Sequence, residues 1–324
     1  MYRIGIDLGG TKISAAVTDT EYNVVSKVSR PTDAKGAAGK LTQDIAELCL
    51  KACTEAQIQI SEVEWIGIGV PGSVDSKNGI VEYCCNIPSL FSYPLADKLS
   101  ELCGVEKVYV DNDANAAALG ESVAGASRGS SSSVMVTLGT GVGGGVIIGG
   151  KILSGNNGAA GELGHMVIEA NGVACPCGRH GCFEAYSSAT ALVRMTKERL
   201  AELKAAGIPT LMLDMCESSP ENANTRTAFD ASKQGDSEAI KLVGEYISYL
   251  ACGITNLVNI FQPEILTIGG GLSGEGDYLL NLLVPLVERD QYTRTYENKT
   301  KIKIATLGNN AGLIGAAALG ETER

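Results

Sequence analysis

Residues 2–18 read YRIGIDLGGTKISAAVT. Tyr2–Asp7 is rich in β-forming residues and predicts a strand, Leu8–Lys12 predicts a tight glycine turn, and Ile13–Thr18 predicts the returning strand. Because glycine has no Cβ, the N–H groups of such a turn can approach the oxygens of a phosphate closely. The stretch therefore predicts a β-hairpin able to hold a phosphate, although ordinary hairpin glycines are the alternative.

The same pattern recurs later in the chain. Residues 132–148 read SSVMVTLGTGVGGGVII, again a strand, a glycine turn and a strand. A third predicted strand, Glu264–Ile268, ends in Gly269-Gly270-Gly271. The recurrence predicts two similar halves of the chain. Three glycine-rich strand ends together favour a nucleotide as the ligand.

Strands and helices alternate along the rest of the sequence. Apolar residues at helical spacing, as in Lys40–Ala56, predict helices, and short β-rich runs such as Trp65–Val70 predict strands. Ser73-Val74-Asp75 is expected to be a turn. The alternation predicts the α/β class. No low-complexity linker occurs, so a domain boundary should be a compact hinge near Asp111–Asp113. Further helices are expected at 114–119, 189–205, 236–260, 279–286 and 311–319, and further strands at 24–30, 107–111 and 301–306.

Two common nucleotide-binding motifs are excluded. Residues 67–72 and 139–144 match G-x-G-x-x-G, but a turn follows the first and a strand follows the second, whereas a dinucleotide fingerprint opens a helix. The G-x-x-x-x-G-K-[ST] pattern of a P-loop does not occur in the sequence. Any phosphate site that the glycine-rich turns form is therefore of another kind.

Length and charge limit the classes of function. The chain has 324 residues, which suits two domains, and its hydrophobic content of 44% can supply large cores. Lys and Arg total 26 against 37 Asp and Glu, a net charge of −11, which argues against nucleic acid or an anionic membrane as partners. The N-terminus lacks the apolar core of a signal peptide, and no stretch reaches the ~18 apolar residues of a membrane span. We expect a cytoplasmic protein.

Cysteine is abundant and histidine is scarce, with 10 and 2 residues respectively. Cys175, Cys177 and Cys182 with one histidine form a donor set that suits tetrahedral Zn²⁺ in a structural site. His165 is favoured as the fourth ligand, because His180 lies inside the loop between two of the cysteines and would reach the same ion only with strain. Free thiols are the alternative. The remaining cysteines are interpreted as buried, small apolar residues: Cys49, Cys53, Cys84, Cys85, Cys103, Cys216 and Cys252.

Several carboxylates occupy positions where chemistry is expected. Asp7 ends the first strand beside its glycine turn, where it could hold a hydrated Mg²⁺. Asp113 follows a predicted strand and can serve as a helix N-cap or as a general base. Glu162 and Glu184 flank the cysteine cluster and could bind neighbouring hydroxyls of a polyol, or they could be ordinary surface acids.

The motifs occur in an order that resembles the ROK family of sugar kinases, within the actin/hexokinase-like ATPase superfamily. The resemblance covers essentially the whole chain. Glu184–Ala191 is further similar to the bacterial glucokinase branch of that family. The motifs that carry the resemblance are Asp7–Lys12, Asp111–Ala116, Leu138–Gly143, Gly161–His165 and Cys175–Glu184.

The resemblance implies two ribonuclease-H-like domains with the active site in a cleft between them. Residues 1–112 with 305–324 would form the smaller domain. Residues 113–304 would form the larger one, with the zinc loop and a dimerisation surface. The implied cofactors are ATP, Mg²⁺ and a structural Zn²⁺, and the implied assembly is a homodimer.

The implied activity is phosphorylation of glucose by ATP to glucose 6-phosphate. The alternatives are a ROK kinase for fructose, N-acetylmannosamine or N-acetylglucosamine, and a non-catalytic sugar-binding regulator. A regulator with a winged helix-turn-helix is disfavoured, because the first strand begins at Tyr2. The resemblance makes Asp113 the catalytic base, and for the sugar it implies Gly72, Asn112, Asp113, Glu162, His165 and Glu184. For the nucleotide, the hairpins and the third strand end offer Asp7, Gly9, Gly10, Thr11, Lys12, Gly139, Thr140, Gly141, Gly270 and Gly271.

Overall fold

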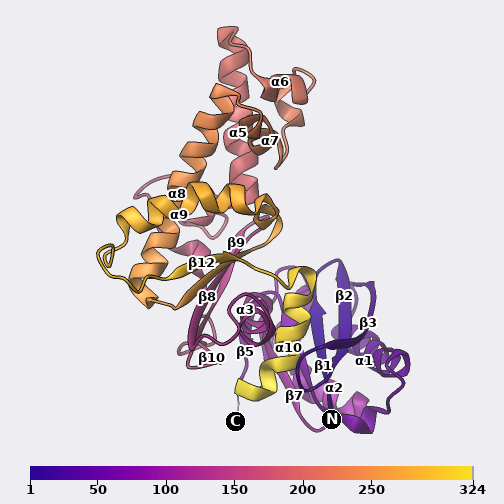
Figure 1. Ribbon diagram of the computed structural model, residues 1–324. Coiled ribbons are helices and arrows are strands. Elements are labelled where there is room, and N and C mark those ends of the chain that lie inside the picture. Colours follow the sequence, from indigo (N-terminus) through magenta and orange to yellow (C-terminus); the bar gives the residue numbers. More distant parts are fainter. Residues whose placement is uncertain (323–324) are drawn as a thin grey trace. The chain divides into compact units, whose positions relative to one another are not determined.

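The computed structural model describes residues 1–322, and the chain forms two compact units (Figure 1). Unit 1 contains Met1–Met135, Gly144–Gly161 and the chain from Ala305 onward, and unit 2 contains Val136–Gly143 and Glu162–Ile304. This division differs from the boundary expected after residue 112. The helix that follows this residue stays in unit 1 because it packs against the C-terminal helix.

The first sheet belongs to unit 1 and has the strand order β3-β2-β1-β4-β7. β1 pairs antiparallel with β2 and parallel with β4, and β4 pairs parallel with β7. The predicted glycine hairpin is therefore present as the connection between β1 and β2. The strands are β1 (Tyr2–Leu8), β2 (Lys12–Thr18), β3 (Val24–Pro31), β4 (Val63–Val70) and β7 (Val108–Asn112).

Two helices rich in small residues, α3 (Asp113–Ala124) and α10 (Ala311–Thr322), pack together in unit 1 (Figure 1). α10 is buried on nearly all sides, as expected for a helix that is apolar all round. It lies directly on β1 and β4, because a Cβ on Gly5 or Gly67 would overlap the carbonyl oxygens of α10. This close packing fixes α3, and with it the residues at the start of α3.

The opposite face of the first sheet is covered by α1 (Ala38–Glu55) and α2 (Leu95–Cys103). Alternate residues of β1 point to this side and join one apolar core with α1. A separate two-stranded sheet pairs β5 (Ser73–Asp75) with β6 (Ile80–Tyr83). The predicted turn at residues 73–75 is thus wrong: these residues form a strand that pairs with a segment further along the chain.

The second sheet has the strand order β10-β9-β8-β11-β12. β10 pairs antiparallel with β9, and β11 pairs parallel with β12. The order places a glycine hairpin, here between β8 and β9, at the same position as the hairpin between β1 and β2 in the first sheet. The predicted repetition is therefore present at the level of whole sheets. The strands are β8 (Ser132–Leu138), β9 (Val142–Ile148), β10 (Lys151–Ile152), β11 (Ile265–Gly269) and β12 (Lys301–Ile304).

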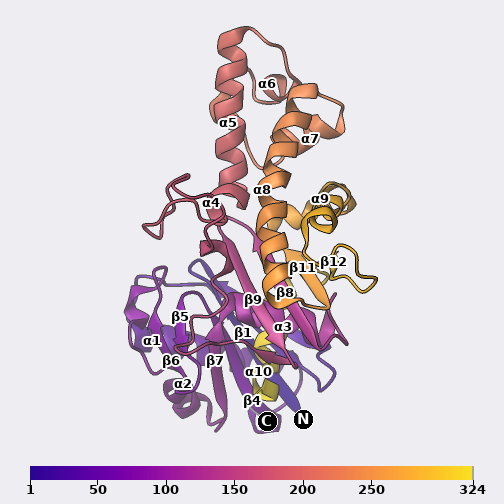
Figure 2. The same cartoon turned by 90° about the vertical axis from the view of Figure 1, so that its left-hand side faces the viewer.

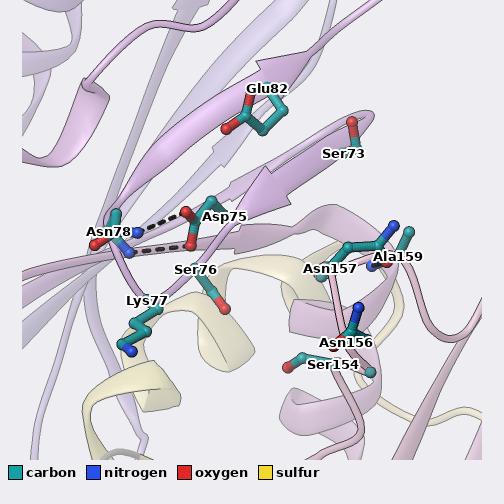
Figure 3. Close-up of a pocket in the computed structure, with 12 residues that line it drawn as sticks. Ser73, Asp75, Ser76, Lys77, Asn78, Glu82, Ser154, Asn156, Asn157 and Ala159 are labelled. Carbon is teal, nitrogen blue, oxygen red and sulfur yellow. Dashed lines mark hydrogen bonds between the residues drawn. The ribbon is translucent and has the colours of Figure 1, made fainter.

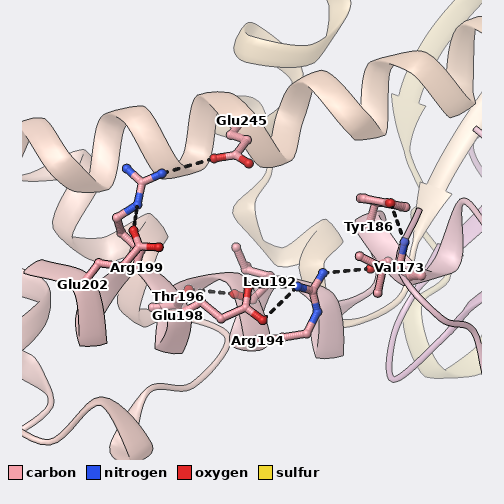
Figure 4. Close-up of polar contacts among 10 residues, drawn as sticks. Val173, Tyr186, Leu192, Arg194, Thr196, Glu198, Arg199, Glu202 and Glu245 are labelled. Atoms are coloured by element: carbon pink, nitrogen blue, oxygen red, sulfur yellow. Dashed lines mark hydrogen bonds and ion pairs between the residues drawn. The ribbon is translucent and has the colours of Figure 1, made fainter. Parts of the chain in front are cut away.

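Most of unit 2 is helical. α5 and α8 run side by side in both views (Figures 1 and 2). The Arg199 side chain of α5 pairs with Glu245 of α8 at 3.4 Å (Figure 4). α4, α6 and α7 were not predicted, because they are short and have too few residues for a clear helical period. The helices are α4 (Glu184–Ser187), α5 (Ala189–Ala206), α6 (Leu211–Met215), α7 (Thr227–Lys233), α8 (Ser237–Phe261) and α9 (Asp277–Asp290).

Two further expectations can be compared with the structure. Of the seven cysteines outside the predicted metal set, Cys85 and Cys252 are exposed, so the expectation that all seven are buried is wrong for these two. Cys85 lies in a turn after β6, and Cys252 lies on a helix side that faces solvent. Among residues 1–322, no helix is both long enough and apolar enough to cross a membrane.

Candidate functional site

The carboxyl ends of three parallel strands bring the predicted residues of unit 1 together. Asp7 of β1 is in register with Gly69 of β4, which is in register with Asp111 of β7. Ligands of open α/β sheets bind at this edge, where the strands end and the loops begin. The register therefore places Asp7 level with Asp111, which is followed directly by Asn112 and Asp113.

Asn112 is the residue that caps α3. Its Oδ1 accepts hydrogen bonds from the N–H groups of Ala114 at 2.9 Å and Asn115 at 3.2 Å, and its Nδ2 donates to the carbonyl oxygen of Gly72 at 3.0 Å. The N-cap role considered for Asp113 therefore belongs to Asn112. Asp113 is the first residue of the helix, and its carboxylate accepts from Ala114 N–H at 2.9 Å.

The negative charge of Asp113 acts on the ionisation of Asp7. Burial raises the pKa of Asp113 above its usual value. Burial also raises the pKa of Asp7, and the negative charge of Asp113 raises it further, while Lys27 and Lys12 act in the opposite direction. Carboxylates with raised pKa values are typical of catalytic acid–base groups and of sites completed by a cation. A divalent cation fits beside Asp7, since its charge would offset the repulsion between the two carboxylates.

The first glycine hairpin is fixed by Thr32. The Thr32 N–H donates to the carbonyl oxygen of Thr11 at 3.0 Å, and its hydroxyl donates to that of Gly9 at 2.6 Å. These bonds tie the hairpin carbonyls to the residue that follows β3. Thr11 and Lys12 are exposed, as residues that approach a phosphate must be.

Residues 83–86, for which the sequence predicted no function, pack against the predicted site residues Gly72 and Gly10. Gly72 has a φ of +105°, and a Cβ there would overlap the carbonyl oxygen of Tyr83. Cys84 is buried, and burial raises the pKa of its thiol, with a smaller contribution from the charge of Asp113. Asn86 lies against Gly10: a Cβ on this glycine would be 3.1 Å from the Cβ of Asn86. No local sequence signal marks residues 83–86 as functional.

A hollow of about 720 Å³ begins at Ser73, the residue after Gly72 (Figure 3). It runs between the β5–β6 hairpin and residues 154–159. Asp75 shapes the hairpin turn by accepting from Asn78 N–H at 3.2 Å and from its Nδ2 at 2.7 Å. Most of the residues that line it have polar side chains, but none is a predicted site residue, so the hollow does not contain the catalytic group.

The second hairpin and the third glycine-rich strand end meet in unit 2. Gly270 has a φ of +80°, and its missing Cβ would lie 2.5 Å from the carbonyl oxygen of Leu138. Gly271 begins the short 3₁₀ turn that follows. The structure therefore brings Gly270 and Gly271 beside the turn Gly139–Gly141, although they are far apart in the sequence.

The predicted metal ligands converge in unit 2. The ligand atoms of His165, Cys175, Cys177 and Cys182 all lie within 4.8 Å of one another. The Sγ atoms of Cys177 and Cys182 are 3.6 Å apart, and Cys175 Sγ is 3.7 Å from His165 Nδ1. Zinc–ligand bonds of about 2.3 Å to sulfur and about 2.0 Å to nitrogen give tetrahedron edges of roughly 3.5–3.8 Å. The donor set and its spacing thus fit a zinc ion, with His165 rather than His180 in the set.

The two predicted sugar-binding acids of unit 2 lie on either side of this cluster. Glu162 Oε2 is 4.0 Å from His165 Nε2, the ring nitrogen that does not face the cysteines. Glu184 Oε1 is 3.8 Å from Cys175 Sγ, and its Oε2 accepts from Val142 N–H at 2.9 Å. The bond to Val142 ties the acid to the second hairpin, a contact that sequence spacing did not predict.

Comparisons with known proteins show the family to which the chain belongs. A family model described as "ROK family" matches residues 3–323. The chain belongs to the ROK family. The glucokinase of Thermotoga maritima is 38% identical to it over 318 residues, which cover 98% of this chain and 96% of that protein.

Solved structures of ROK proteins share the fold over nearly the whole chain. The ROK hexokinase from Thermus thermophilus superposes with a TM-score of 0.81 at 35% identity, covering 100% of this chain and 99% of that one. The ROK family glucokinase from Streptomyces griseus, in complex with glucose and AMPPNP, has a TM-score of 0.77 at 35% identity, covering 98% of this chain and 99% of that one. The predicted membership of the ROK family is confirmed. The predicted fold class, the α/β fold of actin-like ATPases, is confirmed as well.

Proposed function

We propose that this protein is a kinase that transfers the γ-phosphoryl group of ATP to glucose, giving glucose 6-phosphate. One observation carries the proposal: Asp113 stands with a raised pKa at the carboxyl edge of the first sheet, beside Asp7 and the first glycine hairpin. A general base next to phosphate-binding amides is what phosphoryl transfer to a hydroxyl needs. The similarity to glucokinases over 98% of the chain supports glucose as the substrate.

Asp113 would accept the proton of the sugar hydroxyl as the hydroxyl oxygen attacks the γ-phosphorus. Its partial burial raises the pKa, which makes the carboxylate a stronger base than an exposed aspartate. Asn112 caps α3 and so holds Asp113 at a fixed position on the helix. The remaining catalysis is positioning and electrostatic stabilisation of the phosphoryl group by the amides of the first hairpin and by Lys12. Mg²⁺ held near Asp7 would supply positive charge.

The residues of unit 2 would bind the sugar hydroxyls and the nucleotide. Glu162 and Glu184 offer carboxylates, and His165 offers Nε2 while its Nδ1 faces the cysteines. Zinc held by the four-ligand cluster would fix the orientation of this imidazole. Gly139–Gly141 would approach the phosphates, with Gly270 and Gly271 near the nucleoside.

The proposal also covers where the protein works and with what. The enzyme would act in the cytoplasm on a small sugar and ATP, and the net charge of −11 disfavours nucleic acid as a partner. A homodimer remains a prediction from the family resemblance. The hollow that begins after Gly72 has room for a substituent on the sugar. The preferred hexose is therefore determined by experiment.

The test is ADP release measured with glucose, fructose, N-acetylmannosamine and N-acetylglucosamine, and with no sugar. We expect kcat/KM to be highest for glucose and the rate without sugar to be a few per cent of that with glucose. A higher kcat/KM for an N-acetylhexosamine or for fructose would replace glucose as the substrate. If no hexose stimulates ADP release, the chain is not a hexose kinase.

A further inference from the structure

One short segment of the chain, residues 184–190, makes three hydrogen bonds to the second glycine hairpin, and we call it the bridging segment. Val142 N–H donates to Glu184 Oε2 at 2.9 Å, and Ala189 N–H donates to the carbonyl oxygen of Gly139 at 2.8 Å. The Thr190 hydroxyl donates to the carbonyl oxygen of Thr140 at 2.8 Å. These three hydrogen bonds fix both sides of the turn that is proposed to approach the phosphates.

The same segment is attached to the cysteine–histidine cluster. Glu184 lies two residues after Cys182, and its Oε1 is 3.8 Å from Cys175 Sγ. In the loop that carries the cluster, Val173 N–H donates to the Tyr186 hydroxyl at 2.7 Å (Figure 4). The bridging segment therefore contacts the hairpin at one side and the cluster at the other.

Residues of the helical part of unit 2 keep the bridging segment from moving independently. Phe183, which precedes it, is fully buried, and a Cβ on Gly253 of α8 would overlap the Phe183 ring. The hydroxyl of Tyr246, also fully buried in α8, donates to the carbonyl oxygen of Ser187 at 2.6 Å. Arg194 Nη2 donates to the carbonyl oxygen of Ala185 at 3.2 Å. The bridging segment is therefore anchored to the helices of unit 2 while it contacts both the cluster and the hairpin.

A second contact leads from the cluster to the hairpin without the bridging segment. A Cβ on Gly164, which precedes His165, would overlap the carbonyl oxygen of Val142. The ligand histidine is therefore attached to backbone that packs directly on the hairpin. Loss of the metal would release His165 and the cysteines, and both connections to the hairpin would loosen together.

We propose that residues 184–190 couple the four-ligand cluster to the phosphate hairpin, so that metal binding sets the affinity of the enzyme for ATP as well as for sugar. Thr190 is a positioning residue in this coupling: it holds the hairpin through a carbonyl oxygen. The inference rests on the proposed ATP-dependent kinase activity. The metal would then affect nucleotide binding as well as the position of His165, the proposed sugar-binding residue.

The first test compares Thr190→Ala with Thr190→Ser. Thr190 is exposed, so its truncation leaves the core intact. Loss of one hydrogen bond to the hairpin should raise KM for ATP by about three- to tenfold, with KM for sugar changed less than twofold. Thr190→Ser keeps the donor and should behave as the wild type. An unchanged KM for ATP in Thr190→Ala, or an equal rise in Thr190→Ser, would overturn the proposal.

The second test measures nucleotide binding without turnover. AMPPNP binding to the full chain is followed by calorimetry before and after chelation, with zinc content determined on the same sample. We expect removal of the metal to weaken AMPPNP binding several-fold in the wild type, and to weaken it less in Thr190→Ala, because both changes act on the same contacts. Unchanged binding in a zinc-free, folded sample would contradict the coupling. This readout needs no sugar, so it separates failure of the coupling from failure of the proposed kinase activity.

Discussion

Asp113 and Asp7 are ionisable side chains in an environment that disfavours their charge. Burial raises the pKa of both, and the charge of Asp113 raises that of Asp7 further. Since the folded protein holds the Asp113 proton more tightly than the unfolded chain does, the ionised carboxylate lowers the free energy of unfolding. The protein retains a group that is unfavourable for stability at the place where the proposed reaction needs a base.

We predict that Asp113→Asn separates activity from stability. Asparagine keeps the oxygen that accepts from Ala114 N–H but cannot take the proton of the sugar. The value of kcat should fall by about 10²–10⁴-fold. The melting temperature at neutral pH should rise, because the buried charge is gone. Near-wild-type kcat with normal glucose binding would exclude Asp113 as the base.

The pH dependence gives an independent check of the same residue. Below its raised pKa, Asp113 is protonated and cannot act as a base, so kcat/KM should fall with decreasing pH at a pH above the ordinary aspartate value of 3.8. The stability advantage of Asp113→Asn should likewise decrease as pH falls. It should be absent below pH 3.8 and grow as pH rises to the raised pKa, where the folded wild type also becomes ionised. A constant difference in melting temperature across that range would contradict the assignment.

At the scale of the element, α3 is fixed at both ends by hydrogen bonds to other parts of unit 1. Its first turn is capped by Asn112, and its last turn carries Glu121, which is fully buried. Glu121 Oε2 accepts from Ala126 N–H at 2.7 Å and Thr306 N–H at 3.2 Å, and its Oε1 accepts from Leu307 N–H at 2.8 Å. One carboxylate thus joins α3 to the segment where the chain re-enters unit 1.

We predict that Glu121→Gln destabilises the protein by about 1–3 kcal/mol. The glutamine amide would place an N–H₂ group against backbone N–H donors, leaving buried donors unpaired. Urea unfolding measures the change, and Glu106→Gln, an exposed surface position, is the matched control with an expected change near zero. Because α3 carries Asp113, kcat should fall as well. An unfolding free energy equal to that of Glu106→Gln would show that the carboxylate does not hold α3.

Features encoded by neighbouring residues could be predicted from the sequence. The glycine hairpins, the position of Asp113 after β7 and the choice of His165 over His180 all follow from short-range patterns and ligand spacing. The features that were missed depend on contacts between distant residues. Asn86 lies against Gly10, and Glu184 accepts a hydrogen bond from Val142 N–H. No local sequence pattern indicates either contact. The strand at residues 73–75 was missed for a different reason: it has only 3 residues, too few for a clear alternation of polar and apolar side chains.

At the scale of the whole molecule, the ten cysteines fall into three groups that a thiol reagent can distinguish. Cys85 and Cys252 are exposed, and burial raises the pKa of Cys252, so its thiolate is scarcer at neutral pH. In the metal-loaded protein we expect two reactive thiols, Cys85 first and Cys252 more slowly, with the two rates converging as pH rises. Cys85→Ser should remove the faster phase only.

Chelation should expose the second group, because the cluster cysteines lose their metal. Three further thiols should react, with loss of one zinc per chain, and they are Cys175, Cys177 and Cys182. The remaining five are buried and should react only in denaturant. Since a structural zinc site protects its thiolates from a reagent, three thiols that react without chelation would show that the cluster holds no metal. The same result would remove the basis for coupling metal binding to ATP affinity.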